Sequence, residues 1–247
     1  METKRPPKAA LRSWIKEVAS ALPDAGYAIP GGRNRDFGLL YGPCIQASRF
    51  ASSYLTLETA GFAYEGAAVI RAAFEHAVTA HWAYFTTGGI DRFAVAIDRS
   101  FTDHNMAMAK FLDNEELQDA VSSRPARPGK GLPTFTDRMR DLDSSKYLET
   151  TYRSLSLALH PTHAAVTGYL VTGPDHVELK PEPDPSRDNY PELHTAALSA
   201  MLAKSLLEHI INPERARTSL ETVSTRLQLP PFIHDGLAES MRRFDPA

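Results

Sequence analysis

The sequence contains little cysteine, little excess charge and no long apolar run. Cys44 is the single cysteine among 247 residues, which excludes an intramolecular disulfide framework and fits a reducing compartment. The 27 basic residues are balanced by 30 acidic ones, and a pI near 6.3 excludes a strongly basic nucleic-acid coat. No stretch of about 18 residues is apolar and free of charge, and charged residues interrupt the N-terminal segment before a signal sequence can form. We therefore expect a cytoplasmic protein of bacterial type with no membrane span.

Apolar residues make up 43% of the chain, which is enough for a folded core. Their spacing of three and four residues predicts an all-α fold, arranged as an antiparallel helical bundle in a single domain over residues 1–247. The predicted helices cover residues 9–22, 45–59, 62–85, 91–112, 114–122, 135–142, 145–159, 191–211, 213–227 and 233–243.

The predicted domain has three parts. A core bundle covers about residues 9–170, and the helix of residues 62–86 packs at its centre against that of residues 145–160. An acidic, proline-rich connector follows over residues 172–190 and includes one short strand at 176–179. Residues 191–243 form a C-terminal helical extension. Glycine, proline and asparagine predict an irregular loop over residues 27–43.

A polar stripe marks the otherwise apolar helix of residues 66–85. At 100° per residue, Glu75, Thr79 and Trp82 lie within about 80° of Arg71. A buried charge needs a partner, so Arg71 and Glu75 are expected to pair with each other or with a neighbouring polar helix. The stripe has two interpretations: a structural ion pair that sets helix register, or a polar pocket in which an anion meets Arg71.

A second polar group lies in residues 152–163, YRSLSLALHPTH. Arg153, Ser156 and His160 are spaced i, i+3 and i+7, which places them on one helix face. Pro161 predicts that His160 lies at a helix end, where the helix dipole favours a protonated imidazole. His160 could cap this helix end or take part in chemistry.

These two segments together resemble an uncharacterised family of all-helical bacterial domains. The residues that carry the resemblance are Arg71, Glu75, Tyr152, Arg153, Leu155, Ser156, His160 and Pro161. The chain is also loosely similar to the HEPN superfamily, whose hallmark is an arginine followed by a histidine after four to six residues. Arg71 with His76 and Arg153 with His160 both match this spacing.

The HEPN resemblance implies a protein that acts on RNA or nucleotides, as a metal-independent ribonuclease in a toxin or defence system, and a homodimer. His160 would accept the proton of a ribose 2′-hydroxyl and Arg153 would hold the phosphate, with His76 and Arg71 as the second pair. Ligand contacts are expected from Glu75, Ser156, Tyr152 and His163. The alternative is a non-catalytic helical module that binds a partner protein or a small anionic ligand, and a third interpretation assigns these residues to packing alone.

A metal site is the weakest of the chemical interpretations. His160 and His163 have a two-ligand spacing, but the sequence contains no H-E-x-x-H motif and no pair of E-x-x-H motifs. We expect neither a metal nor another cofactor.

Overall fold

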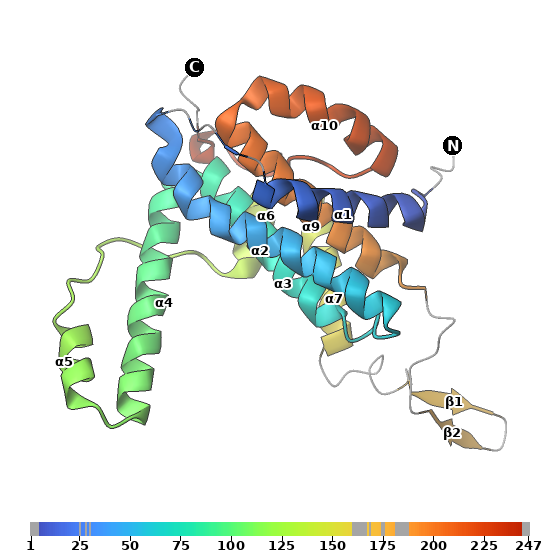
Figure 1. Cartoon of the computed structure of the whole chain (residues 1–247), viewed down its shortest axis with the longest axis horizontal. Coiled ribbons are helices and arrows are strands. Elements are labelled where there is room, and N and C mark those ends of the chain that lie inside the picture. The colour runs from blue at the N-terminus through green and yellow to red at the C-terminus, as the bar shows by residue number, and fades with distance from the viewer. Residues whose placement is uncertain are drawn as a thin grey trace.

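The computed structural model describes residues 5–24, 26–27, 29, 31–159, 167, 169–173, 176–180 and 188–243. This part of the chain is built mainly from α-helices (Figure 1), which confirms the predicted all-α bundle. The α-helices are α1 (Lys8–Asp24), α2 (Asn34–Thr59), α3 (Ala67–Phe85), α4 (Gly89–Phe111), α5 (Glu115–Ser122), α6 (Phe135–Leu142), α7 (Tyr147–Leu159), α9 (Tyr190–Ile211) and α10 (Pro213–Leu227). Two short 3-10 helices cover Gly31–Arg33 and Glu239–Met241.

The core of the bundle is formed by α1, α2, α3 and α9, which pack against one another. Alanines recur along the buried side of α3 and let α2 and α9 approach closely, while Phe74 and Trp82 are buried and contact Phe135 and Asp141 of α6. α9 is buried nearly all round, so it belongs to the centre of the core. The C-terminal extension therefore begins at α10, which packs on α9, and not at residue 191.

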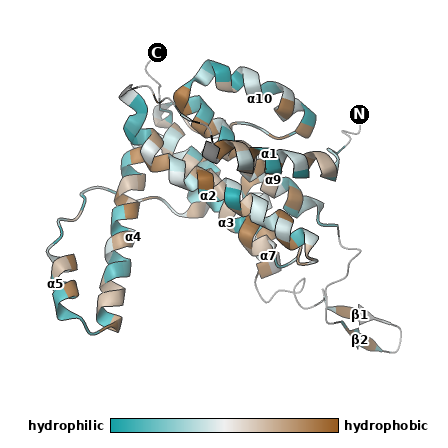
Figure 2. Ribbon diagram, in the orientation of Figure 1, coloured by the Kyte–Doolittle hydropathy of each residue, from teal (hydrophilic) through white to brown (hydrophobic). Residues whose placement is uncertain are grey.

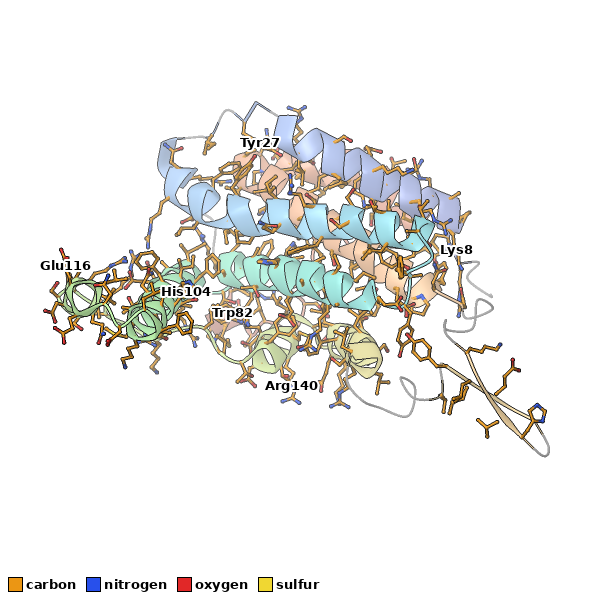
Figure 3. All side chains as sticks on the ribbon, turned by 60° about the horizontal axis from the view of Figure 1, so that its bottom comes forward. Lys8, Tyr27, Trp82, His104, Glu116 and Arg140 are labelled. Carbon is orange, nitrogen blue, oxygen red and sulfur yellow. The ribbon has the colours of Figure 1, made fainter. Side chains whose placement is uncertain are left out.

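α6 and α7 cover the side of α3 that faces away from α1 (Figure 3). The predicted contact between α3 and α7 is present, but α2 and α9 are the main neighbours of α3. α4 leaves the bundle after Gly88, and together with α5 it forms an arm that extends outward (Figure 1). None of the described helices is long and apolar enough to cross a membrane.

The predicted loop over residues 27–43 is wrong, because α2 begins at Asn34 and continues through Pro43. Proline removes one backbone hydrogen bond and costs a helix interior about 3 kcal/mol. Phe37, Leu40 and Cys44 are all buried on one face of α2, and this burial offsets the cost of the proline.

The predicted helix over residues 233–243 is also wrong, since only the 3-10 turn at Glu239–Met241 is helical there. Leu229, Ile233 and Leu237 have helical spacing and are buried, but the segment that carries them runs as an irregular strap. Gly236 donates its N–H to the Leu142 carbonyl at 3.0 Å and holds the strap against the end of α6.

The short strand predicted at 176–179 is confirmed as β2 (Val177–Leu179). It pairs antiparallel with β1 (Leu170–Thr172), which the sequence did not predict, in the register Leu170–Leu179. This hairpin projects from the far end of the bundle (Figure 1).

Candidate functional site

Arg71, Glu75 and Tyr152 form a hydrogen-bonded group between α3 and α7, here called the polar cluster. Arg71 Nε donates to Glu75 Oε1 at 2.9 Å, and the Tyr152 hydroxyl donates to the same carboxylate oxygen at 3.0 Å. The Arg71 guanidinium also donates to the Tyr152 hydroxyl and lies 4.6 Å from the centre of its ring. The predicted pairing of Arg71 with Glu75 and with a neighbouring helix is therefore confirmed.

The polar cluster is not a buried ion pair. The side chains of Arg71 and Glu75 keep 25% and 41% of their accessible surface. Solvent screens a pair at this depth, so its contribution to stability is closer to that of a surface salt bridge than to that of a buried one. Partial burial and the neighbouring Glu75 charge raise the pKa of Tyr152, which keeps its hydroxyl protonated as a donor.

The polar stripe continues along α3 to Thr79 and Trp82, whose partners lie on α6. Trp82 Nε1 donates to Asp141 Oδ2 at 2.8 Å, and Arg138 donates to the Thr79 hydroxyl. Arg138 was not predicted as a site residue, although its position one turn before Asp141 places both on the side of α6 that faces α3.

Arg138 carries a partly desolvated charge. Burial lowers the pKa of Arg138, and the nearby Glu75 carboxylate partly counteracts this by raising it. The Nε of Arg138 is buried and has no hydrogen-bond partner among the described residues. An unsatisfied buried donor is destabilising unless a partner occupies it. The polar cluster and Arg138 therefore place two guanidinium groups around one carboxylate, Glu75.

His76 does not join Arg71. Its ring stacks on Phe50 of α2, with the ring centroids 5.8 Å apart, whereas Arg71 contacts α7. Five residues correspond to about 140° around a helix, so the two side chains face different neighbours. Burial lowers the pKa of His76. The second predicted arginine–histidine pair is thus not brought together, because α3 lies between the two packing partners.

Arg153 lies on the outer side of α7, with 74% of its side chain exposed, and pairs with Glu149 at 2.8 Å. Ser156 donates its hydroxyl to the Tyr152 carbonyl at 2.8 Å, so this hydroxyl is bound to its own helix. His160 and His163 lie outside the described residues, and no geometry is assigned to them. Arg71 reaches Tyr152 on the side of α7 that faces α3, whereas Arg153, the next residue along α7, points about 100° away and is exposed.

A cleft of about 530 Å³ opens beside Arg153, between the end of α6 and the start of α7. Arg140, Lys146 and Arg153 line it, and we call it the cationic cleft. Arg140 and Arg153 both pair with the Glu149 carboxylate, and the hydrogen bond from Arg140 lowers the pKa of Glu149, so it stays ionised. Figure 3 shows Arg140 pointing away from the bundle.

The second carboxylate of the cationic cleft, Asp143, is used by the backbone. Its two oxygens accept hydrogen bonds from the N–H groups of Ser145, at 2.9 Å, and Leu148, at 2.7 Å, at the start of α7. Three cationic side chains therefore face two carboxylates, and the cleft keeps an excess of one positive charge. Arg140 and Lys146 were not predicted, although they flank the same helix start as Arg153 in the sequence.

A second cleft, of about 550 Å³, lies on the neighbouring side of α7 and is here called the aromatic cleft. Tyr147, Tyr190 and His194 line it, and Thr150 borders both clefts. His194 stacks on Tyr190 with the ring centroids 5.9 Å apart, and its Nδ1 lies 3.3 Å from the Tyr147 hydroxyl.

Burial determines the protonation of the groups in the aromatic cleft. It lowers the pKa of His194 and raises the pKa of Tyr147 to about 12. The imidazole is therefore neutral near pH 7, and its Nδ1 can accept the tyrosine proton in a hydrogen bond. The sequence signal that could have found this cleft is the i, i+4 spacing of Tyr190 and His194 at the start of α9.

Comparison with known proteins gives no match, since no family model, no curated protein and no solved structure is significantly similar to this chain. Among the described residues, no group of three or more histidine, cysteine, aspartate or glutamate side chains is placed to hold a metal ion. The functional interpretation therefore depends on the two clefts and the polar cluster.

Proposed function

We propose that the chain acts on RNA or a nucleotide, whose phosphate binds in the cationic cleft. The observation that carries the proposal is the charge of this cleft, where Arg140 and Arg153 pair with the Glu149 carboxylate and Lys146 adds a third cation. Guanidinium groups bind phosphate oxygens through paired hydrogen bonds, and exposed side chains such as that of Arg153 can exchange a carboxylate partner for a phosphate at small cost.

The aromatic cleft supports the same assignment, because a base needs a flat apolar surface next to its phosphate. Tyr190 and His194 supply stacked rings, and Thr150 connects this cleft with the cationic one. Proteins that bind single-stranded RNA commonly stack its bases on aromatic side chains. A single nucleotide unit would place its base against Tyr190 and its phosphate near Arg153.

Metal-independent cleavage of RNA is the finer part of the proposal, and it depends on His160. The imidazole would take the 2′-hydroxyl proton, the 2′-oxygen would attack phosphorus, and the 5′-oxygen would leave with a proton from a second donor. Arg153 would offset the charge that grows on the phosphoryl oxygens. The spacing of Arg153 and His160 resembles that of HEPN nucleases, and this resemblance is the basis for the step.

A non-catalytic module is the alternative, and Arg138 is the observation that favours it. Its Nε is buried without a partner, and it lies near Arg71 across the single carboxylate of Glu75. A small anion such as phosphate or sulfate would satisfy this donor between α3, α6 and α7.

Binding is tested with the full chain and a fluorescently labelled single-stranded RNA, by anisotropy at several salt concentrations. Three phosphate contacts predict a log–log salt slope of about −2 for a single strand. Arg153→Ala with Arg140→Ala should weaken binding at least tenfold and flatten the slope. Arg226→Ala removes an exposed arginine of α10 and serves as the matched control. Absence of binding by the parent chain overturns the proposal.

Cleavage is tested separately, with the same RNA and EDTA present. His160→Ala should abolish cleavage and leave the affinity for RNA within about twofold of the parent chain. His176→Ala replaces an exposed histidine near β2 and is the control for handling and contaminating nuclease. If His160→Ala cuts as fast as the parent, or if the parent binds RNA without cutting it, the catalytic step is wrong and only binding remains.

A further inference from the structure

The arm formed by α4 and α5 carries an exposed apolar face against which no other described helix packs. Figure 1 shows the arm extending away from the bundle, and Figure 2 shows apolar residues along the length of α4. The side of α4 that faces α5 is closed at Ala109, which is fully buried. On an adjacent side, Phe101 and Phe111 expose 53% and 83% of their surface, which is unusual for phenylalanine.

The exposed residues of α4 follow a seven-residue repeat. Ile97, Phe101, His104, Met108 and Phe111 are separated by four, three, four and three positions. This is the a and d spacing of a helix that packs along its whole length against another helix. All five side chains are exposed, so the seam is intact but has no second helix in the described chain.

We infer that a second copy of this chain covers the seam, with the two α4 helices antiparallel about a two-fold axis at His104. Ile97 and Phe111 lie seven positions on either side of this residue, and Phe101 and Met108 lie three and four positions from it. Ile97 would face Phe111 of the other copy, Phe101 would face Met108, and the two His104 side chains would lie next to each other. A two-fold contact joins two identical surfaces and therefore stops at a dimer. The single polar residue in the seam, His104, fixes the register of the two helices.

The base of the arm is positively charged. The loop after α5 returns along α4, where Arg99 donates to the Gly129 carbonyl at 2.7 Å. Arg124 pairs with Asp98 at 2.6 Å and lies over the Phe101 ring. The exposed cations of this loop are Arg124, Arg127 and Lys130.

The tip of the arm has the opposite charge. Its exposed carboxylates are Asp113, Glu115, Glu116 and Asp119, with Lys110 as the one cation among them. Figure 3 shows Glu116 on α5 beside α4 in this part of the arm. An antiparallel contact places each acidic tip against the basic base of the other copy, whereas a parallel contact would place like charges together.

The free part of the arm sets the area of the contact. The first turns of α4 are buried against the bundle, and the part from Ile97 to Phe111 is about 21 Å long. Two neighbouring elements are roughly 20 Å wide, so the free face measures roughly 420 Å². A standard protein interface buries about 800 Å² per partner. The arm alone therefore supplies about half of the area of a standard interface.

The first test measures the mass of the full chain by sedimentation equilibrium. Protein concentrations between about 1 and 100 µM detect both a tight and a weak dimer. The parent chain should be a dimer, and Phe101→Glu with Met108→Glu should be a monomer with an unchanged far-UV spectrum. Leu179→Glu alters an exposed apolar residue of β2 and should remain dimeric. A monomeric parent chain overturns the inference, and so does a dimer that the double variant retains.

The second test fixes the geometry by cross-linking with a short bis-maleimide. Cys44 is fully buried and burial raises the pKa of its thiol, so the parent chain should not react. His104→Cys should cross-link to its own copy in most molecules, because it lies at the axis. Asp103→Cys is equally exposed one residue away but points about 100° from the seam, and it should not cross-link. Efficient cross-linking of Ile97→Cys to itself would show a parallel pair and overturn the antiparallel arrangement.

Discussion

Tyr152 of α7 donates a hydrogen bond to the Glu75 carboxylate of α3 at 3.0 Å, although 77 positions separate the two residues in the sequence. Arg71 contacts both residues, so the three groups hold α7 against the helix at the centre of the bundle. α7 also presents Arg153 to the cationic cleft and Tyr147 to the aromatic cleft. The polar cluster therefore positions both clefts without lying in either.

Tyr152→Phe tests this link between α3 and α7. The substitution removes the hydroxyl but keeps the ring under the Arg71 guanidinium, and we expect a loss of about 0.5–1.5 kcal/mol in the free energy of unfolding in urea. Tyr41→Phe removes a hydroxyl for which no hydrogen bond is described, and it should change stability by less than about 0.5 kcal/mol. Equal effects of the two substitutions would show that the Tyr152 hydroxyl contributes nothing specific.

Arg138→Met tests the desolvated guanidinium of α6. Methionine keeps much of the volume and removes the buried donor, so the free energy of unfolding should stay within about 1 kcal/mol of the parent or rise. Phosphate gives the second measurement. If an anion binds at Arg138, phosphate at ten times its Kd should stabilise the parent chain by about 1.4 kcal/mol. The same phosphate should leave the stability of Arg138→Met unchanged. Chloride is used to keep the ionic strength equal in all samples. An equal response of both chains would place phosphate elsewhere.

Gly236→Ala and Gly38→Ala should have opposite effects on stability. A Cβ at Gly236 would lie 2.8 Å from the Asp141 carbonyl oxygen, so the strap must move away from α6, at a cost of about 1–3 kcal/mol. A Cβ at Gly38, in the exposed face of α2, meets no atom within 4 Å and should add about 0.5–1 kcal/mol. Unfolding of both variants in urea measures the two changes in the free energy of unfolding. If Gly236→Ala leaves this free energy unchanged, the close contact between the strap and α6 is contradicted.

Because the His81 side chain is buried, we expect the protein to lose stability at acid pH. His81 is fully buried, its Nε2 lies 2.8 Å from the Leu202 carbonyl, and burial lowers its pKa to about 4. The unfolded chain binds a proton near pH 6.5 and the folded chain does not, so this contribution to stability is complete above pH 6.5. It falls as the pH drops from 6.5 to 4, by about 3 kcal/mol at most.

The measurement is the free energy of unfolding at several pH values between 7 and 4.5 for the parent and for His81→Gln, whose amide can still donate to Leu202. The variant should show a shallower dependence on pH. Burial also lowers the pKa of His76, His194 and His234, so part of the dependence remains in the variant. His176→Gln, in an exposed position before β2, should follow the parent, and an equal slope for His81→Gln would contradict the assignment.

Local patterns in the sequence predicted most helices and part of the site. The i, i+4 spacing of Arg71 and Glu75 is a short-range relation, so a helix of any packing brings them together. The pairing of Arg71 with His76 failed because the direction of each side chain depends on what packs on the two sides of α3. Tyr190 and His194 could not be assigned to a cleft, since the aromatic cleft joins them to Tyr147, which is distant in the sequence. Arg140 and Lys146 are close to Arg153 in the sequence, but the way in which α6 and α7 meet decides that they line one cleft.

The amino-acid sequence by itself determined that this chain is helical, because apolar residues at three- and four-residue spacing can bury a common face only in a helix. It also determined the seam of α4, which is a property of one helix. The tertiary structure decided which faces are covered: it placed α9 in the core, kept α2 helical through Pro43, and left the α4 seam exposed. Burial depends on contacts between distant segments, and the free energy of those contacts outweighs the local preferences of the residues that make them.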